Sequence, residues 1–226
     1  MTRAVSLALA LTACLLQAQN PLSVSKPEKD NSVKAELASF TVDKRLQVNL
    51  FADESMGIAN PVCMRWDARG RLWVLCTWAY PQLKPGTKPN DKLLILEDTK
   101  GDGRADKIST YIDGLNMPTG FALGHGGAYI GNGRDLIHVR DTNGDGKADK
   151  QEVLFTGFGT GDTHQNINSF TWSPGGELFF SQGLHCFSRV QTPWGIRKLD
   201  EHGSWRLRPL RRQLHAHRRT SGGGNP

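Results

Sequence analysis

Short apolar runs rich in β-branched and aromatic residues follow one another along most of the chain. The runs "PVCMRW" and "RLWVLCTW" flank residues 67–70, and a turn sequence between two such runs is typical of a β-hairpin. Glycine is abundant, with 25 residues among 226, whereas runs that favour helices are scarce. The pattern therefore predicts an all-β protein rich in turns.

The later runs form units that repeat. "KLLILE", the loop "DTKGDGRADK" (98–107) and "ISTYI" are followed by "LIHVR", the loop "DTNGDGKADK" (141–150) and "EVLFTG". A third unit opens with "NSFTW" and "ELFFSQG" and closes with "SWRLRP". Four short strands recurring about every 40–45 residues are typical of β-propeller blades. We expect about three four-stranded blades over residues 41–210. A solenoid of β-arches and a two-sheet sandwich are the alternatives.

The first residues indicate export. Arg3, an apolar run over residues 4–16 and then small and polar residues have the form of a signal peptide ending at residue 18. The run is too short to span a bilayer as a helix. Alternatively, "LTAC" (11–14) resembles a lipoprotein signal, which would attach lipid to Cys14 and anchor the protein to a membrane. Both interpretations place the protein in the periplasm or outside the cell.

The two ends of the remaining chain differ in composition from its body. Residues 19–40 are polar and contain proline, which predicts a linker. Residues 211–226 are basic and predict an irregular tail, which a shift of the reading frame would explain. The net charge is +6, but residues 1–196 hold 20 Lys and Arg against 20 Asp and Glu. Because the excess charge is confined to the segment after residue 196, we expect no nucleic-acid partner.

Three cysteines remain once a signal peptide is removed. Cys63 and Cys76 flank the first hairpin, and we expect them on one face in diagonal positions. They predict either a disulfide or two small buried side chains. Cys186 is the third. The chain contains no C-x-x-C-H sequence, and we therefore expect no covalently bound haem.

The second Asp/Gly loop fits the Ca²⁺-binding pattern D-x-[DN]-x-[DN]-G-x₅-E in full. Its predicted ligands are Asp141, Asn143, Asp145, Lys147 through its carbonyl, Asp149 and Glu152. The first loop keeps Asp98, Asp102 and Asp106 but has Lys100 and Ser109 at two ligand positions. Clustered carboxylates repel one another without a cation, which favours a structural Ca²⁺ in the second loop. The alternative is a turn held by hydrogen bonds from the backbone to these side chains.

His164 is the main candidate for chemistry. It lies in a polar loop before a predicted strand, close in sequence to Asp162 and Gln165. Loops that enter the innermost strand of a propeller blade surround the central axis, where ligands bind. An imidazole can accept a proton from an alcohol near neutral pH, and a nearby carboxylate would fix its tautomer. The alternative is a loop histidine with a purely structural role.

Several motifs match known proteins in order. "NPVCMRWDARGRLWV", "LEDTKGDGRADK", "GLNMPTGFAL" and "RVQTPWGI" resemble large exported propeller proteins classed as membrane-bound dehydrogenases. More distantly, "HQNINSFTWSPGGELFFSQG" is similar to a segment of the quinone-dependent (PQQ) soluble sugar dehydrogenases. In those enzymes the histidine is the general base, and hydride passes to a quinone that rests on a Ca²⁺ ion.

The resemblance implies roles for particular residues. His164 would be the base, with Asp162 and Gln165 as its neighbours. Gln182 and His185 are weaker candidates for the rim of a cofactor pocket, and a structural role is the alternative for each. The expected function is oxidation of a sugar or another alcohol with a PQQ-type quinone. The Ca²⁺ beneath the quinone would be separate from any ion in the Asp/Gly loops.

The chain also departs from those enzymes. They have six blades, and the basic and aromatic residues that hold their cofactor in the later half have no counterpart here. Two alternatives therefore remain open. One is a non-catalytic exported propeller, braced by Ca²⁺, that binds glycans or proteins. The other is a truncated product without a function of its own.

Overall fold

The computed structural model describes residue 30 and residues 32–218. The predicted signal segment, Cys14 and residues 219–226 of the predicted tail lie outside the described residues. The chain divides into two compact units, Met1–Val48 and Asn49–Pro226. No helix among the described residues is long and apolar enough to cross a membrane.

Among its described residues, the first unit contains one short helix, α1 (Val33–Ser39). Ser32 caps its N-terminus, and its hydroxyl accepts a hydrogen bond of 3.2 Å from the amide of Ala35. This helix lies within the segment for which the sequence predicted only a linker. The capping serine followed by "VKAELAS" was the signal that could have located it.

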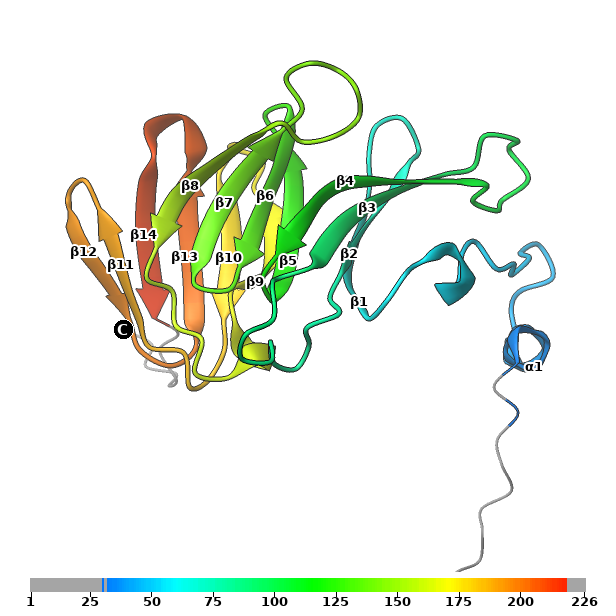
Figure 1. Cartoon of the computed structure of the whole chain (residues 1–226), viewed down its shortest axis with the longest axis horizontal. Coiled ribbons are helices and arrows are strands. Elements are labelled where there is room, and N and C mark those ends of the chain that lie inside the picture. Colours follow the sequence, from blue (N-terminus) through cyan, green and yellow to red (C-terminus); the bar gives the residue numbers. More distant parts are fainter. Residues whose placement is uncertain (1–29, 31, 219–226) are drawn as a thin grey trace, which may run out of the picture. The chain divides into compact units, whose positions relative to one another are not determined.

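The second unit is all-β, as predicted (Figure 1). Its first sheet contains β1 (Pro61–Trp66), β2 (Leu72–Cys76), β3 (Asp91–Glu97) and β4 (Lys107–Leu115). The second sheet contains β5 (Pro118–Gly124), β6 (Gly127–Asn132), β7 (Asp135–Arg140) and β8 (Lys150–Thr156). In both sheets the strands are antiparallel and pair in sequence order.

The third sheet has the order β14-β13-β10-β9, with β9 (Asn168–Trp172), β10 (Leu178–Gln182), β13 (Gly203–Arg208) and β14 (Gln213–Arg218). A separate hairpin, β11 (Ser188–Thr192) and β12 (Gly195–Leu199), is inserted between β10 and β13. Short 3-10 turns occur at Glu54–Met56, Thr163–Gln165 and Pro209–Arg211. The three larger sheets each contain four antiparallel strands, the inserted hairpin forms a two-stranded sheet of its own, and none of these sheets closes on itself.

The predicted tail is wrong over β14. The structure pairs this strand with β13 from Gly203↔Arg218 to Arg208↔Gln213. Leu214 is buried, and Ala216 packs against the same core. The sequence did not indicate this strand because its basic residues suggested an irregular segment. Basic residues are nevertheless common on a strand at the edge of a sheet.

The sheets pack on one another through their apolar faces. One cluster, which includes Leu93, Phe121 and Ile137, joins the first two sheets. A second cluster, centred on Phe170, Phe180 and Trp205, joins the second and third sheets and includes residues of the inserted hairpin. The first strands of consecutive sheets, β1, β5 and β9, are neighbours in this packing.

Cys63 and Cys76 do not lie on one face of the sheet, which corrects the predicted diagonal placement and leaves the alternative without a disulfide. A β-bulge between Pro61 and Cys63 shifts the register, so that Cys63 pairs with Leu75 and Pro61 pairs with Cys76. Cys63 packs on the core between the first two sheets, whereas Cys76 packs on the opposite face of its sheet. Cys63, Cys76 and Cys186 are all free thiols.

A buried histidine in the second sheet predicts pH-dependent stability. The ring of His138 is stacked on Tyr129, with ring centroids 4.1 Å apart, and Nε2 lies 3.2 Å from the carbonyl of Gly124. Burial lowers the pKa of His138 below 6.5, and the charge of Arg140 lowers it further. The unfolded chain therefore binds this proton more readily than the folded chain.

We expect the free energy of unfolding to fall as the pH drops below 6.5, until the depressed pKa of His138 is reached. One such proton contributes a slope of at most about 1.4 kcal/mol per pH unit. Urea unfolding of the chain and of His138→Gln between about pH 5 and about pH 7, a range that includes the ordinary histidine pKa, measures this slope. Equal slopes in the two proteins would contradict the assignment.

Candidate functional site

The predicted catalytic residues lie together at one end of the third sheet. Asp162 precedes the 3-10 turn Thr163–Gln165, which leads into β9. The Asp162 carboxylate accepts a hydrogen bond of 3.0 Å from the amide of His164. The same oxygen, Oδ1, lies 2.9 Å from Nδ1 of the His164 ring. The chain thus folds back locally to hold an Asp–His pair.

This pair is accessible from solvent. The His164 side chain is 60% exposed and the Asp162 side chain is 32% exposed. Because an ionised carboxylate only accepts hydrogen bonds, the neutral His164 ring carries its proton on Nδ1 and its lone pair on Nε2. The hydrogen bond from His164 holds the pKa of Asp162 below 3.8, and the nearby His185 lowers it as well.

Neighbouring loops fix the position of the pair. The ring of Tyr80, from the loop between β2 and β3, meets the His164 ring edge to face, with centroids 5.2 Å apart. The thiol of Cys186 donates to the carbonyl of Gln165 over 3.1 Å, and burial raises the pKa of this thiol. The amide of Gly183 donates to the same Gln165 carbonyl over 2.9 Å. Gln165 therefore ties the loop to β10 through its backbone.

The two residues expected at a cofactor rim have different surroundings. His185 is exposed, has a φ of 59° and lies near Asp162. Gln182 is only 3% exposed, and its Oε1 accepts hydrogen bonds from Ser188 and Trp205. Its Nε2 donates to the carbonyls of Cys186, Leu199 and Glu201. Gln182 therefore anchors the inserted hairpin, and its polar atoms are occupied inside the core, which favours the structural role over a place at a cofactor rim.

Sequence reasoning missed Asp91, a buried carboxylate at the same end of the sheets. Its side chain is fully buried and accepts four hydrogen bonds. The donors are the hydroxyl of Thr77 and the amides of Trp78, Ala79 and Met117. Asp91 thus joins the loop between β2 and β3, which carries Tyr80, to the entry of β5.

The two Asp/Gly loops share one structure and connect equivalent strands, β3 to β4 and β7 to β8. In the first loop, Asp98 accepts hydrogen bonds from the amides of Gly101, Asp102 and Gly103. In the second, Asp141 accepts from Gly144 over 2.6 Å and from Gly146 over 2.9 Å. The amide and hydroxyl of Thr99 bind Asp106, just as those of Thr142 bind Asp149. These bonds hold the pKa of Asp98, Asp106 and Asp149 below 3.8.

The predicted Ca²⁺ ligands are engaged by the protein itself. Asn143 accepts from the amide of Asp145, and Asp145 and Asp102 accept from the amides of Lys147 and Arg104. Glu152 lies on β8 and forms an ion pair with Arg212. No three or more His, Cys, Asp or Glu side chains within residues 32–218 are arranged to hold a metal ion. Backbone donors thus offset the repulsion between these carboxylates, which was the reason for expecting an ion.

Substitutions at two positions of the second Asp/Gly loop should lower the free energy of unfolding by different amounts. In EDTA, Asp141→Ala should lower the free energy of unfolding by about 1–2 kcal/mol, because two loop amides lose their acceptor. Asp145→Ala removes one exposed acceptor of a backbone amide and should cost less than half as much. Urea unfolding compares the two variants, and equal losses would contradict this account. Repeating the comparison with Ca²⁺ tests the metal site, since stabilisation that requires Asp145 would show binding.

The surroundings of His164 do not form a seat for a PQQ-type quinone, whose carboxylates need cationic partners. The charged groups that most affect Asp162 are His164 and His185. Neither Lys nor Arg forms a hydrogen bond or ion pair with His164 or Asp162 in the part of the chain that the structure describes. Pockets of about 740 and 630 Å³ lie elsewhere, and neither is lined by these two residues. Around His164 the described residues thus supply a proton acceptor and no Lys or Arg bonded to it or to Asp162.

Comparison with known proteins gives structural matches of low identity. A carbohydrate-active enzyme of family AA12 from Trichoderma reesei, in its iodide structure, is 18% identical with a TM-score of 0.43. That match covers 61% of this chain and 32% of the enzyme. The calcium structure of a Trichoderma reesei AA12 enzyme is also 18% identical, with a TM-score of 0.41, and the match covers 57% of this chain and 31% of that one.

A luciferin-regenerating enzyme is 15% identical with a TM-score of 0.40, and the match covers 62% of this chain and 44% of that enzyme. The chain therefore spans less than half the length of each of these structures. No curated protein matches the sequence. A family match covers residues 32–224, which includes the strand β14 and the rest of the basic segment up to residue 224. The chain belongs to the family described as Domain of unknown function (DUF7133).

Proposed function

We propose that this chain forms about three blades of a β-propeller whose Asp162–His164 pair is the proton acceptor in the oxidation of a sugar or another alcohol. The observation that carries the proposal is the exposed His164 ring, which is held through Nδ1 by Asp162 and has Nε2 free. The resemblance of "HQNINSFTWSPGGELFFSQG" to quinone-dependent sugar dehydrogenases supports the same role.

The repeated sheets support the propeller interpretation. Three four-stranded antiparallel sheets follow one another, and their first strands are neighbours. In such an arrangement the loop that enters the first strand of a sheet lies near the central axis. His164 lies in the loop that enters β9, and Tyr80 and His185 come from loops at the same end.

The chemistry of the pair follows from its geometry. A hydroxyl that approaches Nε2 can transfer its proton there, and a quinone supplied as the oxidant would take the hydride from the carbon that bears the hydroxyl and be reduced. The Asp162 carboxylate then faces an imidazolium and stabilises its charge across the 2.9 Å contact with Nδ1. Tyr80 packs against the ring edge to face and restricts its rotation. The proposal concerns the proton-accepting half of the reaction.

The test is an oxidation assay with the full chain, a panel of aldoses and simple alcohols, and a dye that accepts electrons, with and without added PQQ and Ca²⁺. Dye reduction that needs both the quinone and His164 supports the proposal. Binding of a sugar without oxidation, unchanged in His164→Asn, would support a non-catalytic binding protein instead. If the chain neither bound nor oxidised any of these compounds, the proposed function would be overturned.

A further inference from the structure

A pocket with aromatic and charged walls lies at the opposite end of the sheets from His164. It has a volume of about 740 Å³, within the range of about 300–1,000 Å³ that ligand pockets occupy. The turns β5–β6, β9–β10 and β13–β14 enclose it, and its walls include His125, Trp172, Glu177, Arg208, Leu210 and Arg211. We name it the Trp172 groove. Because His164 precedes β9 and Trp172 ends it, the groove and the Asp162–His164 pair are separate sites.

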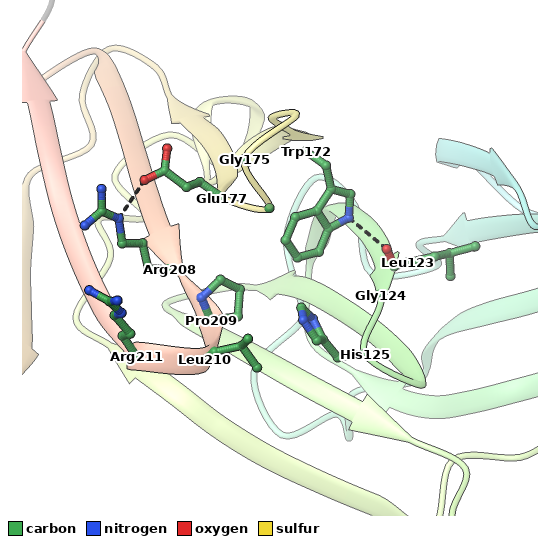
Figure 2. Close-up of a pocket in the computed structure, with 11 residues that line it drawn as sticks. Leu123, Gly124, His125, Trp172, Gly175, Glu177, Arg208, Pro209, Leu210 and Arg211 are labelled. Atoms are coloured by element: carbon green, nitrogen blue, oxygen red, sulfur yellow. Dashed lines mark hydrogen bonds and ion pairs between the residues drawn. The ribbon is translucent and has the colours of Figure 1, made fainter.

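One wall of the groove is aromatic (Figure 2). Trp172 donates its indole N–H to the carbonyl of Leu123 over 2.8 Å, so its polar atom is occupied and its ring presents an apolar surface. The ring lies against Gly124, where a Cβ atom would come within 2.6 Å of it. His125 packs edge to face on Trp172, and its Nδ1 lies 3.0 Å from the Tyr129 hydroxyl, which leaves Nε2 without a partner among the described residues.

The other wall is cationic. Figure 2 shows Arg208 and Arg211 on the side of the groove opposite Trp172 and His125. Glu177 binds Nε of Arg208 at 2.7 Å, which fixes the guanidinium and leaves its two terminal nitrogens without a hydrogen-bond partner in the described residues. No ion pair involving Arg211 occurs within residues 32–218. The lining thus carries two positive charges against one negative charge, and Arg206, 3.9 Å from Glu177, adds a third positive charge nearby.

The excess of positive charge affects a neighbouring group. Burial lowers the pKa of His215, and the charges of Arg206 and Arg208 lower it further. A ligand of this groove therefore needs an anionic group to face the arginines. It also needs an apolar face for Trp172 and for Leu210, whose side chain is exposed. Hydroxyl groups would suit Glu177 and Nε2 of His125.

We infer that the Trp172 groove binds a short carboxylate-bearing sugar chain, such as an oligouronate. The C–H face of a pyranose ring would lie on Trp172, and its carboxylate would receive paired hydrogen bonds from Arg208. A free phosphate or sulfate has no apolar face for Trp172 and Leu210 to contact. Nucleic acid would require a longer cationic surface than two arginines opposed by one glutamate.

Isothermal titration of the full chain with trigalacturonate, galactotriose and a short oligothymidine tests the inference. We expect trigalacturonate to bind, and galactotriose to bind at least about ten-fold more weakly because it lacks the charge-assisted hydrogen bonds. Arg208→Gln and Arg211→Gln should each weaken trigalacturonate binding by about ten-fold. Lys198→Gln removes one positive charge from an exposed position on β12, outside the groove, and should change binding less than about two-fold.

Thermal unfolding of each variant shows whether it remains folded. Arg211→Gln breaks no ion pair within residues 32–218, so its binding result stands even if Arg208→Gln is destabilised. Equal affinity for galactotriose, tighter binding of oligothymidine, or equal losses in Lys198→Gln and Arg211→Gln would each overturn the inference. Absence of trigalacturonate binding to the folded chain would overturn it as well.

Discussion

Replacing Asp91 by asparagine should lower the free energy of unfolding by about 3–5 kcal/mol, a large part of the stability of a typical domain. The carboxylate is fully buried, and its Oδ1 accepts from the amides of Trp78 at 2.6 Å and Ala79 at 3.0 Å. Its Oδ2 accepts from the Thr77 hydroxyl and the Met117 amide, both at 2.9 Å. An asparagine has a single acceptor oxygen, so its amide N–H₂ would face a backbone N–H and leave it unpaired.

Urea unfolding of Asp91→Asn and of the matched variant Asp113→Asn measures this cost. Asp113 lies exposed on β4, and its replacement should change stability by less than about 0.5 kcal/mol. The dependence of the free energy on urea should stay the same in both variants, since neither changes the surface exposed on unfolding. A loss below about 1 kcal/mol in Asp91→Asn would show that the four hydrogen bonds do not hold the two sheets together.

Asp91 also shows the limit of what the sequence predicts. The strands were predictable because alternating or continuous apolar runs were separated by turn residues, and the two Asp/Gly loops identified equivalent positions in successive sheets. Asp91 is a single polar residue at the start of such a run, and nothing local shows that four donors from two other segments converge on it. Contacts of this kind arise from tertiary packing and carry no local pattern.

The difference between a local sequence pattern and tertiary packing also explains which of the other site residues could be predicted. The proximity of Asp162 and His164 follows from two residues of spacing and a local turn, and the structure brings them together at 2.9 Å. The face of the sheet on which Cys63 lies was predicted wrongly because a β-bulge shifts its register without a clear sequence signal. The inserted hairpin that Gln182 anchors also had no clear sequence signal. The Trp172 groove combines three turns from two sheets, so no single motif could have indicated it.

The strand β14 is an intermediate case. Leu214 and Ala216 alternate with His215 and His217, which is the two-residue period of a strand with one buried face. The density of basic residues around them favoured an irregular tail instead. An edge strand carries such charges because they prevent pairing with another chain, so charge alone is a poor argument against a strand.

In the oxidation assay, His164→Asn should reduce kcat/KM by about 10²–10⁴-fold, the usual contribution of a positioned general base. Asp162→Asn should cause a smaller loss of about 10-fold or more, because the amide oxygen can still accept from the amide and Nδ1 of His164 but cannot offset the charge of an imidazolium. His217→Asn removes an exposed imidazole from β14 and should leave kcat/KM unchanged.

The order of these losses distinguishes a catalytic pair from a structural one. The hydrogen bond from His164 depresses the pKa of Asp162 below 3.8. The contribution of the ionised Asp162 carboxylate to the pair is therefore present above pH 3.8, and it is lost only as the pH falls through the lower pKa of the folded state. The advantage of the wild type over Asp162→Asn should therefore persist throughout the neutral range. A purely structural pair would instead lower thermal stability in both variants in parallel with activity. If His164→Asn retained full activity while remaining folded, His164 would not be the base, and the proton acceptor would have to be sought elsewhere.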